Sequence, residues 1–194
     1  MDEILSVAGP EVFTRVIVWR KAGRRVEVLV ARMDSGRYTF LGGRTRVRPQ
    51  EGLLDAMVRE LGEETLASRY ELKRFEEQLA WDSWWFAVGW NHRRILAYDV
   101  YFITRWGANY GEMPLIRLNP NDEDYRMVNA VEWVPIALLT RPNLVQYRNQ
   151  AAALNHARKM IRNWVDPMSL YKGGSLSEGQ YSDTEIGPRV VAWV

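Results

Sequence analysis

The sequence predicts an α/β fold, of the α+β kind, in which strands and helices share one core. Residues 12–20 and 26–32 are rich in β-branched and aromatic side chains, which is typical of β-strands. Residues 51–64 and 144–165 instead carry apolar side chains at three- and four-residue spacing, which is typical of amphipathic helices. Asn143, directly before the second of these helices, can cap it. Strands and helices combined in one chain of this length favour an α/β domain.

The remaining elements follow from turn residues and from short apolar runs. A short strand at residues 38–41 ends in Gly42 and Gly43, a pair that lets the backbone bend sharply or approach a ligand closely. Residues 70–80 are polar with scattered apolar positions, so a strand and a helix both stay open. Further along the chain we expect strands at 81–90, 95–106 and 130–135, a loop at 107–120 and a helical turn at 136–139.

The composition indicates one domain with a substantial core. The chain has 194 residues, of which 47% are hydrophobic, and its 26 basic and 24 acidic side chains nearly balance. A net charge of +2 does not indicate a nucleic-acid or membrane binder. The absence of cysteine excludes a disulfide framework and a thiolate metal site, and it fits a reducing compartment. The chain has no signal-peptide profile and no run of eighteen apolar residues, so we expect a cytoplasmic protein without a membrane partner.

The helix expected at residues 51–64 combines an apolar face with concentrated negative charge. Its apolar side chains share one face, which would pack on a core: Leu54, Met57, Val58 and Leu61, with Leu53 at the edge. Glu60, Glu63 and Glu64 stand within about one turn, and three like charges so close repel one another. Mg²⁺ would resolve the repulsion, because it prefers carboxylate oxygens and keeps waters that a phosphate substrate can displace. The alternative is a solvated acidic face without a metal.

The charged residues of this helix fall at the spacing of a known motif. Glu51 is followed by seven residues and then by Arg59 and Glu60, and Glu63 and Glu64 come after two more residues. The segment resembles the Nudix box, which reads Gly, five residues, Glu, seven residues, Arg-Glu, an aliphatic residue, any residue, Glu-Glu, any residue, Gly and an aliphatic residue. The hairpin, short strand, glycine loop and acidic helix also come in the order of that family.

Residues 43–67 depart from the box at two positions. Gly43 precedes the first glutamate by seven residues instead of five, so the loop is longer here or Thr45 stands in the place of the first glycine. Leu66 replaces the second glycine, which would sit just past the helix end. Without that glycine the helix can run on through residues 67–68.

The resemblance implies the Nudix fold, a mixed β-sheet sandwiched between helices, and a metal centre. Mg²⁺, with Mn²⁺ as a substitute, would be held by Glu60 and Glu64, with Glu63 as a third ligand or as the general base. Arg59 would pair with Glu51 or Glu63 and hold the carboxylates in place. The catalytic residues implied are therefore Glu51, Arg59, Glu63 and Glu64.

Arginines and tryptophans are the candidates for substrate contact. Arg44, Arg46 and Arg48 follow Gly43 at alternate positions, and guanidinium groups bind phosphate oxygens bidentately. The alternative is solubilising charge on an exposed loop. Trp84 and Trp85 lie in a strand that the resemblance places opposite the acidic helix, so either could stack on a nucleobase. The alternative is that both belong to the core or its rim.

The resemblance allows two kinds of general base, a glutamate of the box or an acidic residue later in the chain. In many Nudix proteins a loop before a strand with Trp and Pro holds an extra acid that ligates a metal or activates water. Asp122, Glu123 and Asp124 stand at that place in this sequence. The alternative is an ordinary acidic turn.

The C-terminal segment has its own composition. We assign residues 1–167 to the Nudix domain and residues 168–194 to a tail that is rich in Gly, Ser and charge, as flexible segments are. Residues 190–194 are nevertheless apolar, so we expect them to dock on their own domain or on the sheet edge of a partner.

The activity that the resemblance implies is hydrolysis of the diphosphate in a nucleoside diphosphate linked to another moiety. Dinucleotides, ADP-ribose-like compounds, nucleotide sugars and nucleoside triphosphates all stay open, because residues 81–84 match neither the proline nor the tyrosine that marks two Nudix subclasses at that distance. We expect no nucleic-acid partner, although capped RNA and a homodimer are left open. The alternative function is a catalytically weak Nudix-fold sensor or regulatory module.

Overall fold

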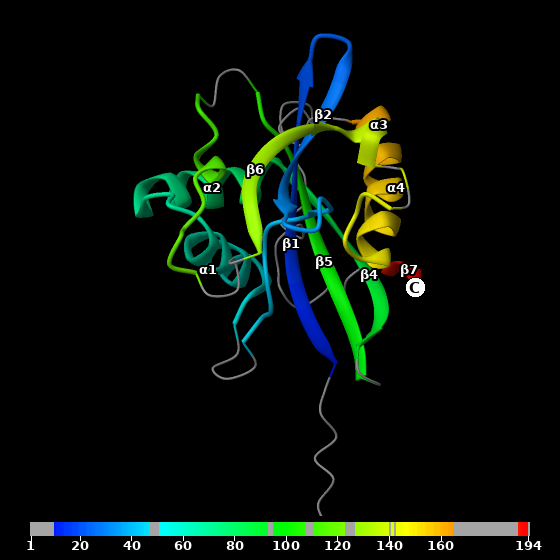
Figure 1. The fold of residues 1–194 in the computed structure, drawn as a ribbon. Coiled ribbons are helices and arrows are strands. Elements are labelled where there is room, and N and C mark those ends of the chain that lie inside the picture. The colour runs from blue at the N-terminus through cyan, green and yellow to red at the C-terminus, as the bar shows by residue number, and fades with distance from the viewer. Residues whose placement is uncertain are drawn as a thin grey trace, which may run out of the picture.

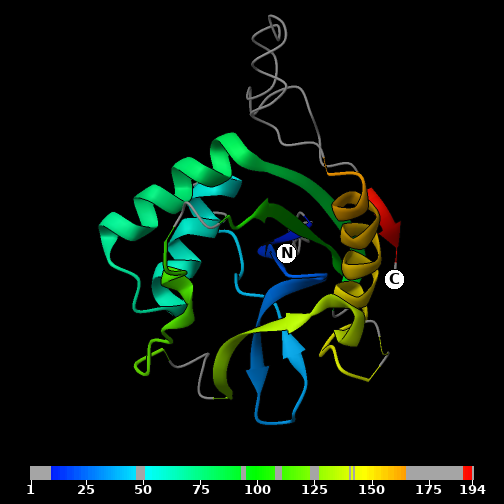
Figure 2. The ribbon, with the colours of Figure 1, turned by 90° about the horizontal axis from the view of Figure 1, so that it is seen from above.

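The computed structural model describes residues 10–46, 51–92, 95–107, 111–122, 127–139, 141, 143–164 and 190–193. Within them a sheet lies between two layers of helices, as Figures 1 and 2 show. The elements in chain order are β1 (Glu11–Ala22), β2 (Arg25–Met33), β3 (Tyr38–Thr39), α1 (Leu53–Glu64), α2 (Arg69–Asp82), β4 (Ser83–His92), β5 (Ile95–Arg105), the 3₁₀ turn η2 (Pro114–Ile116), β6 (Val128–Pro135), α3 (Ile136–Leu139), α4 (Arg148–Arg162) and β7 (Val190–Trp193).

The sheet is mixed. Its strands run in the order β3-β2-β1-β5-β4-β7 within the described part of the chain, and β6 pairs with β2 outside this path. β1 lies parallel to β5, with Val16 opposite Phe102, whereas β1–β2 and β4–β5 are antiparallel. The hairpin expected from the aromatic-rich runs is therefore confirmed as β4 and β5, which lie side by side within the sheet, between β1 and β7.

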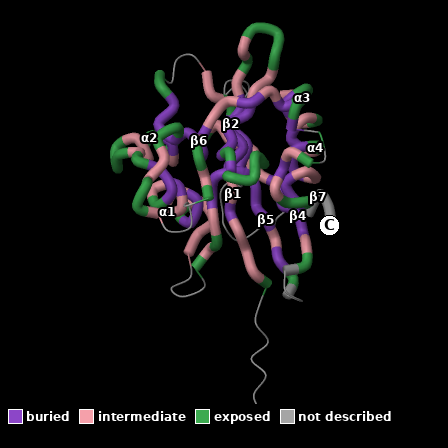
Figure 3. Tube along the Cα trace, in the orientation of Figure 1, coloured by how far each residue is buried: buried purple, intermediate pink, exposed green. Residues whose placement is uncertain are grey.

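Helices cover both faces of this sheet, because successive strand residues point to opposite sides. Val16 and Val18 of β1 pack with Met57 and Leu61 of α1 on one side, where α2 also packs. Ile17 and Trp19 pack on the other side with the apolar residues of α4: Ala153, Leu154, Ala157 and Ile161. Figure 3 shows the buried residues concentrated along the central strands and the helix faces toward them. The predicted sandwich of a mixed sheet between helices is confirmed.

The acidic helix ends earlier than one reading of the sequence allowed. α1 stops at Glu64, and Thr65 is already extended, with its hydroxyl donating to Leu61 O at 2.7 Å. The chain then pairs with a distant segment, since Leu66 N donates to Arg117 O and Asn119 N donates to Glu64 O. The continuation through residues 67–68 is therefore wrong, because partners about fifty residues away hold the end of the helix.

Residues 70–80, for which helix and strand were both open, form most of α2. Ser68 starts this helix with a reciprocal cap, in which its hydroxyl accepts from Glu71 N and its own N–H donates to the Glu71 carboxylate. α2 runs through Trp81 to Asp82, so the strand expected from residue 81 begins only at Ser83. Pairing with Thr104 of β5 starts at that residue.

The second long helix also begins later than the periodicity suggested. Residues 144–146 pair with β3 instead, because Tyr38 N donates to Leu144 O at 2.7 Å and Gln146 N donates to Tyr38 O at 2.8 Å. The helix starts after Tyr147, so the expected cap at Asn143 is wrong.

The C-terminal apolar segment pairs with the sheet. β7 lies parallel to β4, with Ala87 opposite Val190. The expected docking of this segment is therefore found on the edge of the chain's own sheet. Across the described residues, no helix is long and apolar enough to cross a membrane.

Candidate active site

A cavity of about 410 Å³ opens where the loop after β3 meets α1. Its acidic wall comes from one turn of α1 and from the segment before β6: Glu60, Glu63, Glu64 and Asp122. Its other walls combine loop backbone, arginines and apolar side chains, among them Gly42, Gly43, Arg15, Arg44, Phe13 and Tyr147. Met57 and Leu61 anchor α1 in the core, which turns the opposite side of the same helix toward this loop.

The two glycines let the loop approach both β1 and α1 closely. Gly42 has φ +119°, and a Cβ there would lie 2.2 Å from the Thr14 carbonyl oxygen. A Cβ on Gly43 would lie 2.0 Å from Oε2 of Glu60. Any side chain at either position would therefore displace the strand backbone or the glutamate.

Glu64 is buried and held by the loop. Its Oε2 accepts a hydrogen bond of 2.8 Å from Gly42 N, and only 7% of the residue is exposed. Burial raises the pKa of Glu64 to about 8, although the Gly42 N–H and the Arg15 guanidinium oppose that rise. The negative charges of Glu60 and Asp122 add to it. Without a metal ion, this carboxyl is therefore largely protonated at neutral pH.

Glu60 faces the same loop, one helical turn before Glu64. Its carboxylate lies against Gly43 and accepts a hydrogen bond of 2.7 Å from Arg59 Nη1. Burial raises the pKa of Glu60, while the arginine partly offsets the rise. Two carboxyl groups whose charged forms are disfavoured thus share one cavity wall.

Arg59 connects the carboxylates around the cavity. Its Nε and Nη2 bind the two oxygens of Glu51 at 2.7 and 3.0 Å, and its Nη1 also reaches Glu63 at 2.9 Å. Nη2 also donates a hydrogen bond of 2.9 Å to the carbonyl oxygen of Arg44. The pKa of Glu51 is lowered, mainly by the hydrogen bond from Arg59. The guanidinium therefore ties α1 to the loop that precedes it.

Comparison with solved structures places this architecture in a known fold. The Nudix domain of Shewanella oneidensis NrtR, solved with ADP ribose, has a TM-score of 0.51 at 15% identity, covering 82% of this chain and 94% of that chain. The chain has the Nudix fold. A Listeria monocytogenes protein assigned as a Nudix hydrolase has a TM-score of 0.51 at 12% identity, covering 80% of this chain and 96% of that one. A C. elegans Ap4A hydrolase has a TM-score of 0.50 at 12% identity, covering 79% of this chain and 99% of that chain.

No family model matches the sequence, and no curated protein matches it. At identities of 12% to 15%, the similarity to these structures establishes the fold, whereas the activity depends on the residues of the site. In this chain, α1, which carries the residues of the box, and the loop with Gly42 and Gly43 lie around one cavity.

Of the three loop arginines considered for phosphate contact, Arg44 and Arg46 lie near the carboxylates and are paired in different ways, whereas Arg48 lies outside the described residues. Arg44 lines the cavity, and its Nη2 donates to Glu11 at 2.6 Å. Arg46 reaches Glu63 at 3.1 Å, and both side chains of this pair are about half exposed. Glu63 thus stands between Arg46 and Arg59, at the rim of the cavity.

The two tryptophans proposed for stacking are not on the cavity wall. Trp84 packs, partly buried, against the core on the α4 side, and Trp85 packs against the core on the α1 side. The aromatic side chains that do line the cavity include Phe13 and Tyr147, and 48% of Tyr147 is exposed. The sequence offered no signal for Tyr147, because it comes to the cavity through the pairing of residues 144–146 with β3.

Of the three acids considered as a general base, Asp122 lines the cavity and acts electrostatically on Glu64. Glu123 and Asp124 lie outside the described residues. The sequence interpretation also missed Arg15, which lines the cavity and whose Nη1 donates to Phe40 O at 3.2 Å and to Gly42 O at 2.9 Å. A charged residue inside the apolar strand at residues 12–20 was the available signal.

The oxygen donors fit a hard cation such as Mg²⁺. Among the residues that the structure describes, no three acidic or histidine side chains form a metal-binding group. Two carboxylates are sufficient in principle, because Mg²⁺ commonly binds through one or two carboxylates and completes its shell with waters and phosphate oxygens. Glu60 and Glu64 share a wall, and both have raised pKa values, so a cation there would favour their charged forms.

The raised pKa of Glu64 gives a stability prediction with a defined sign. Between the ordinary value of 4.5 and about 8, the folded chain holds a proton on Glu64 that the unfolded chain has released. In EDTA, the free energy of unfolding should therefore fall as pH rises through this window, by up to about 1.4 kcal/mol per pH unit. Glu64→Gln removes the effect, so the variant should melt above the wild type at pH 8 and close to it at pH 5. Parallel pH profiles of the two melting temperatures would contradict the assignment.

Proposed function

We propose that the chain is a Mg²⁺-dependent hydrolase that cleaves the diphosphate of a nucleoside diphosphate linked to another moiety. The proposal rests on one observation above all, which is that Glu60 and Glu64 face the glycine loop within a single cavity. An acidic helix face that served only solubility would lie in solvent, whereas Glu64 is buried.

The residues of the box would have separate roles in metal binding, proton transfer and positioning. Glu60 and Glu64 would hold Mg²⁺ or Mn²⁺, with Glu63 as a third ligand or as the general base. An ion bound there would neutralise charge on the diphosphate and lower the pKa of a bound water. Arg59 keeps the carboxylates in position, and Asp122 is the second candidate for the base, because it lines the same cavity.

The rest of the cavity would bind the substrate. The Gly42–Gly43 backbone lines the cavity, and Arg44 and Arg46 would contact the phosphate oxygens of a substrate once they exchange their present carboxylate partners. The half-exposed ring of Tyr147 is the best placed surface for a nucleobase. The neighbours make two substrate classes worth testing first, since one is an Ap4A hydrolase and another was solved with ADP ribose.

A nucleotide-binding sensor is the second candidate. Two observations favour it: among the described residues no three acidic side chains form a metal-binding group, and Glu63 is paired with Arg46 and Arg59. In that case the cavity would bind a nucleotide without turning it over.

A substrate panel separates the two functions. Dinucleoside polyphosphates, ADP-ribose, nucleotide sugars and nucleoside triphosphates are incubated with the full chain and Mg²⁺, Mn²⁺ or EDTA, and products are identified by mass. We expect turnover of at least one compound with either ion and none in EDTA. Tight binding of a compound without turnover would favour the sensor, and neither binding nor turnover would contradict both.

Replacing Arg59 with lysine is expected to lower kcat by about tenfold or more while KM changes little. A lysine keeps the charge but cannot bind Glu51 bidentately and reach Glu60 and Glu63 at once, so the carboxylates lose their fixed positions. Arg117→Lys is the matched control, because Arg117 binds both oxygens of Glu71 on the surface away from the cavity. Equal rates for the two lysine variants would show that Arg59 has no such role.

A further inference from the structure

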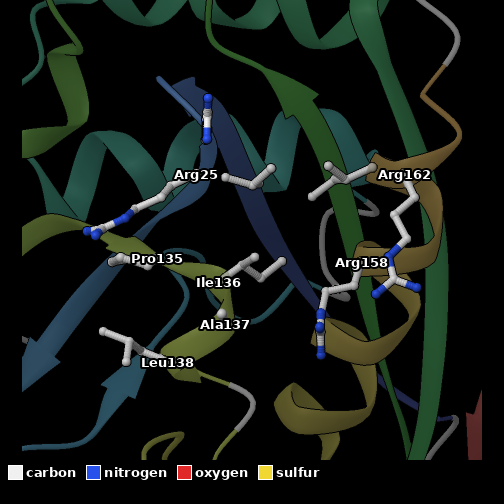
Figure 4. A pocket seen from close by; sticks show the side chains of 10 residues that line it. Arg25, Pro135, Ile136, Ala137, Leu138, Arg158 and Arg162 are labelled. Atoms are coloured by element: carbon white, nitrogen blue, oxygen red, sulfur yellow. The ribbon is translucent and has the colours of Figure 1, made fainter.

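A second cavity, of about 520 Å³, lies away from the candidate active site. Three parts of the fold form it: the β1–β2 turn with the first residues of β2, the junction of β6 with α3, and the last turns of α4. Figure 4 shows Arg158 and Arg162 of α4 on one side of the opening and Arg25 on the other, with Ile136 and Ala137 between them. No described residue lines both cavities.

Among the described residues that line this cavity, four are arginines and none carries a carboxylate. They are Arg24, Arg25, Arg158 and Arg162. Within the described part of the chain, none of these four guanidinium groups makes a hydrogen bond or ion pair to a protein group. The arginines that line the candidate active site differ in this respect, because Arg15 pairs with Asp99 and Arg44 with Glu11.

These positive charges repel one another, and none of the described residues that line the cavity carries a compensating negative charge. Arg158 and Arg162 stand at i and i+4 on α4, where like charges destabilise a helix. The negative end of the helix dipole partly compensates Arg162 in the last turn. It does not account for Arg24 in the β1–β2 turn or for Arg25 at the start of β2, both across the cavity. A bound anion would neutralise both sides at once.

The remaining lining is apolar, which narrows the class of anion. Val26, Pro135, Ile136, Ala137, Leu138 and Ile161 form it. A volume of about 520 Å³ falls in the range of small-molecule sites, roughly 300–1,000 Å³. Inorganic phosphate would leave this apolar wall without a partner, whereas a phosphorylated molecule with a ring system would cover it.

We propose that this cavity is a second ligand site, for an organic polyphosphate such as a nucleoside di- or triphosphate. The phosphates bind between the arginines of α4 and those of the β1–β2 turn, where guanidinium groups can bind phosphate oxygens bidentately. The ring system lies against Pro135 to Leu138. This site is independent of the hydrolase proposal, because it uses none of the residues of the box.

The test is calorimetric titration of the full chain with ATP and, separately, with inorganic pyrophosphate, both in EDTA. The pocket variant is Arg158→Gln/Arg162→Gln. Its matched control is Arg148→Gln/Lys159→Gln, which removes the same charge from the same helix at two exposed residues that do not line the cavity. We expect the pocket variant to bind ATP at least tenfold more weakly than the wild type, and the control to stay within about twofold.

Two further variants separate the alternatives. Leu138→Gln, at a residue that is 42% exposed, should weaken ATP binding but leave pyrophosphate binding unchanged. Glu64→Gln should retain the second site, so failure of the hydrolase proposal and failure of this one are distinguishable. The proposal is overturned if ATP does not bind in EDTA, if the control variant loses as much affinity as the pocket variant, or if a polyglutamate peptide binds more tightly than ATP. Melting temperatures of each variant check folding.

Discussion

Glu64→Gln is expected to lower kcat/KM for the substrate found in the panel by about 10²-fold or more, with a small change in substrate affinity. Glutamine can still accept the hydrogen bond from Gly42 N, so the loop stays in place. It lacks the negative charge that would hold the ion opposite the diphosphate, and that charge matters most when charge develops in the transition state. Steady-state rates at saturating Mg²⁺ measure the effect.

The same variant also shows whether a lower rate comes from the missing carboxylate or from unfolding of the protein. Burial of the Glu64 carboxyl raises its pKa, so the neutral glutamine should make the metal-free protein more heat-stable at pH 8, in the direction opposite to the loss of rate. Glu77→Gln makes the same chemical change at an exposed position of α2 and should leave both properties unchanged. Retention of more than about a third of the wild-type rate would remove Glu64 from the metal site.

The box helix and the glycine loop could be predicted because their signals are local. The helix is encoded by apolar spacing over three turns, and the carboxylates follow from positions 60, 63 and 64 on the same helix. Glycine before such a helix already suggested a close backbone approach, and Gly42 and Gly43 do meet β1 and Glu60. Nothing beyond a window of about twenty residues was needed.

What could not be predicted depends on contacts between distant segments. The end of α1 is decided by Arg117 and Asn119, and the start of α4 by the pairing of residues 144–146 with β3. The same pairing brings Tyr147 to the cavity, while Trp84 and Trp85 pack against the core. A stretch rich in tryptophan predicts burial or binding equally well, and only the position of the strand in the sheet separates the two.

Arg15→Met is expected to lower the free energy of unfolding by roughly 3–5 kcal/mol, because it leaves a buried carboxylate without its cation. Asp99 is fully buried on β5, and its Oδ2 accepts from Arg15 Nε at 3.4 Å, from Tyr101 OH and from Asn149 Nδ2. Burial and the Asp99 charge both raise the pKa of Tyr101, so its hydroxyl stays a donor. Urea unfolding measures the loss. Arg32→Met is the control, since its pair with Glu132 is largely solvated and should contribute about 1 kcal/mol or less.

The double variant Arg15→Met/Asp99→Asn tells stability apart from positioning. Asparagine removes the unpaired charge and keeps an acceptor for Tyr101 and Asn149, so most of the lost stability should return. The rate should not return, because Arg15 also binds Phe40 O and Gly42 O, and the Gly42 N–H in turn holds Glu64. We expect kcat to stay about tenfold or more below the wild type, with KM little changed. If the rate recovers together with the stability, Arg15 supports the sheet alone and the glycine loop keeps its geometry without it.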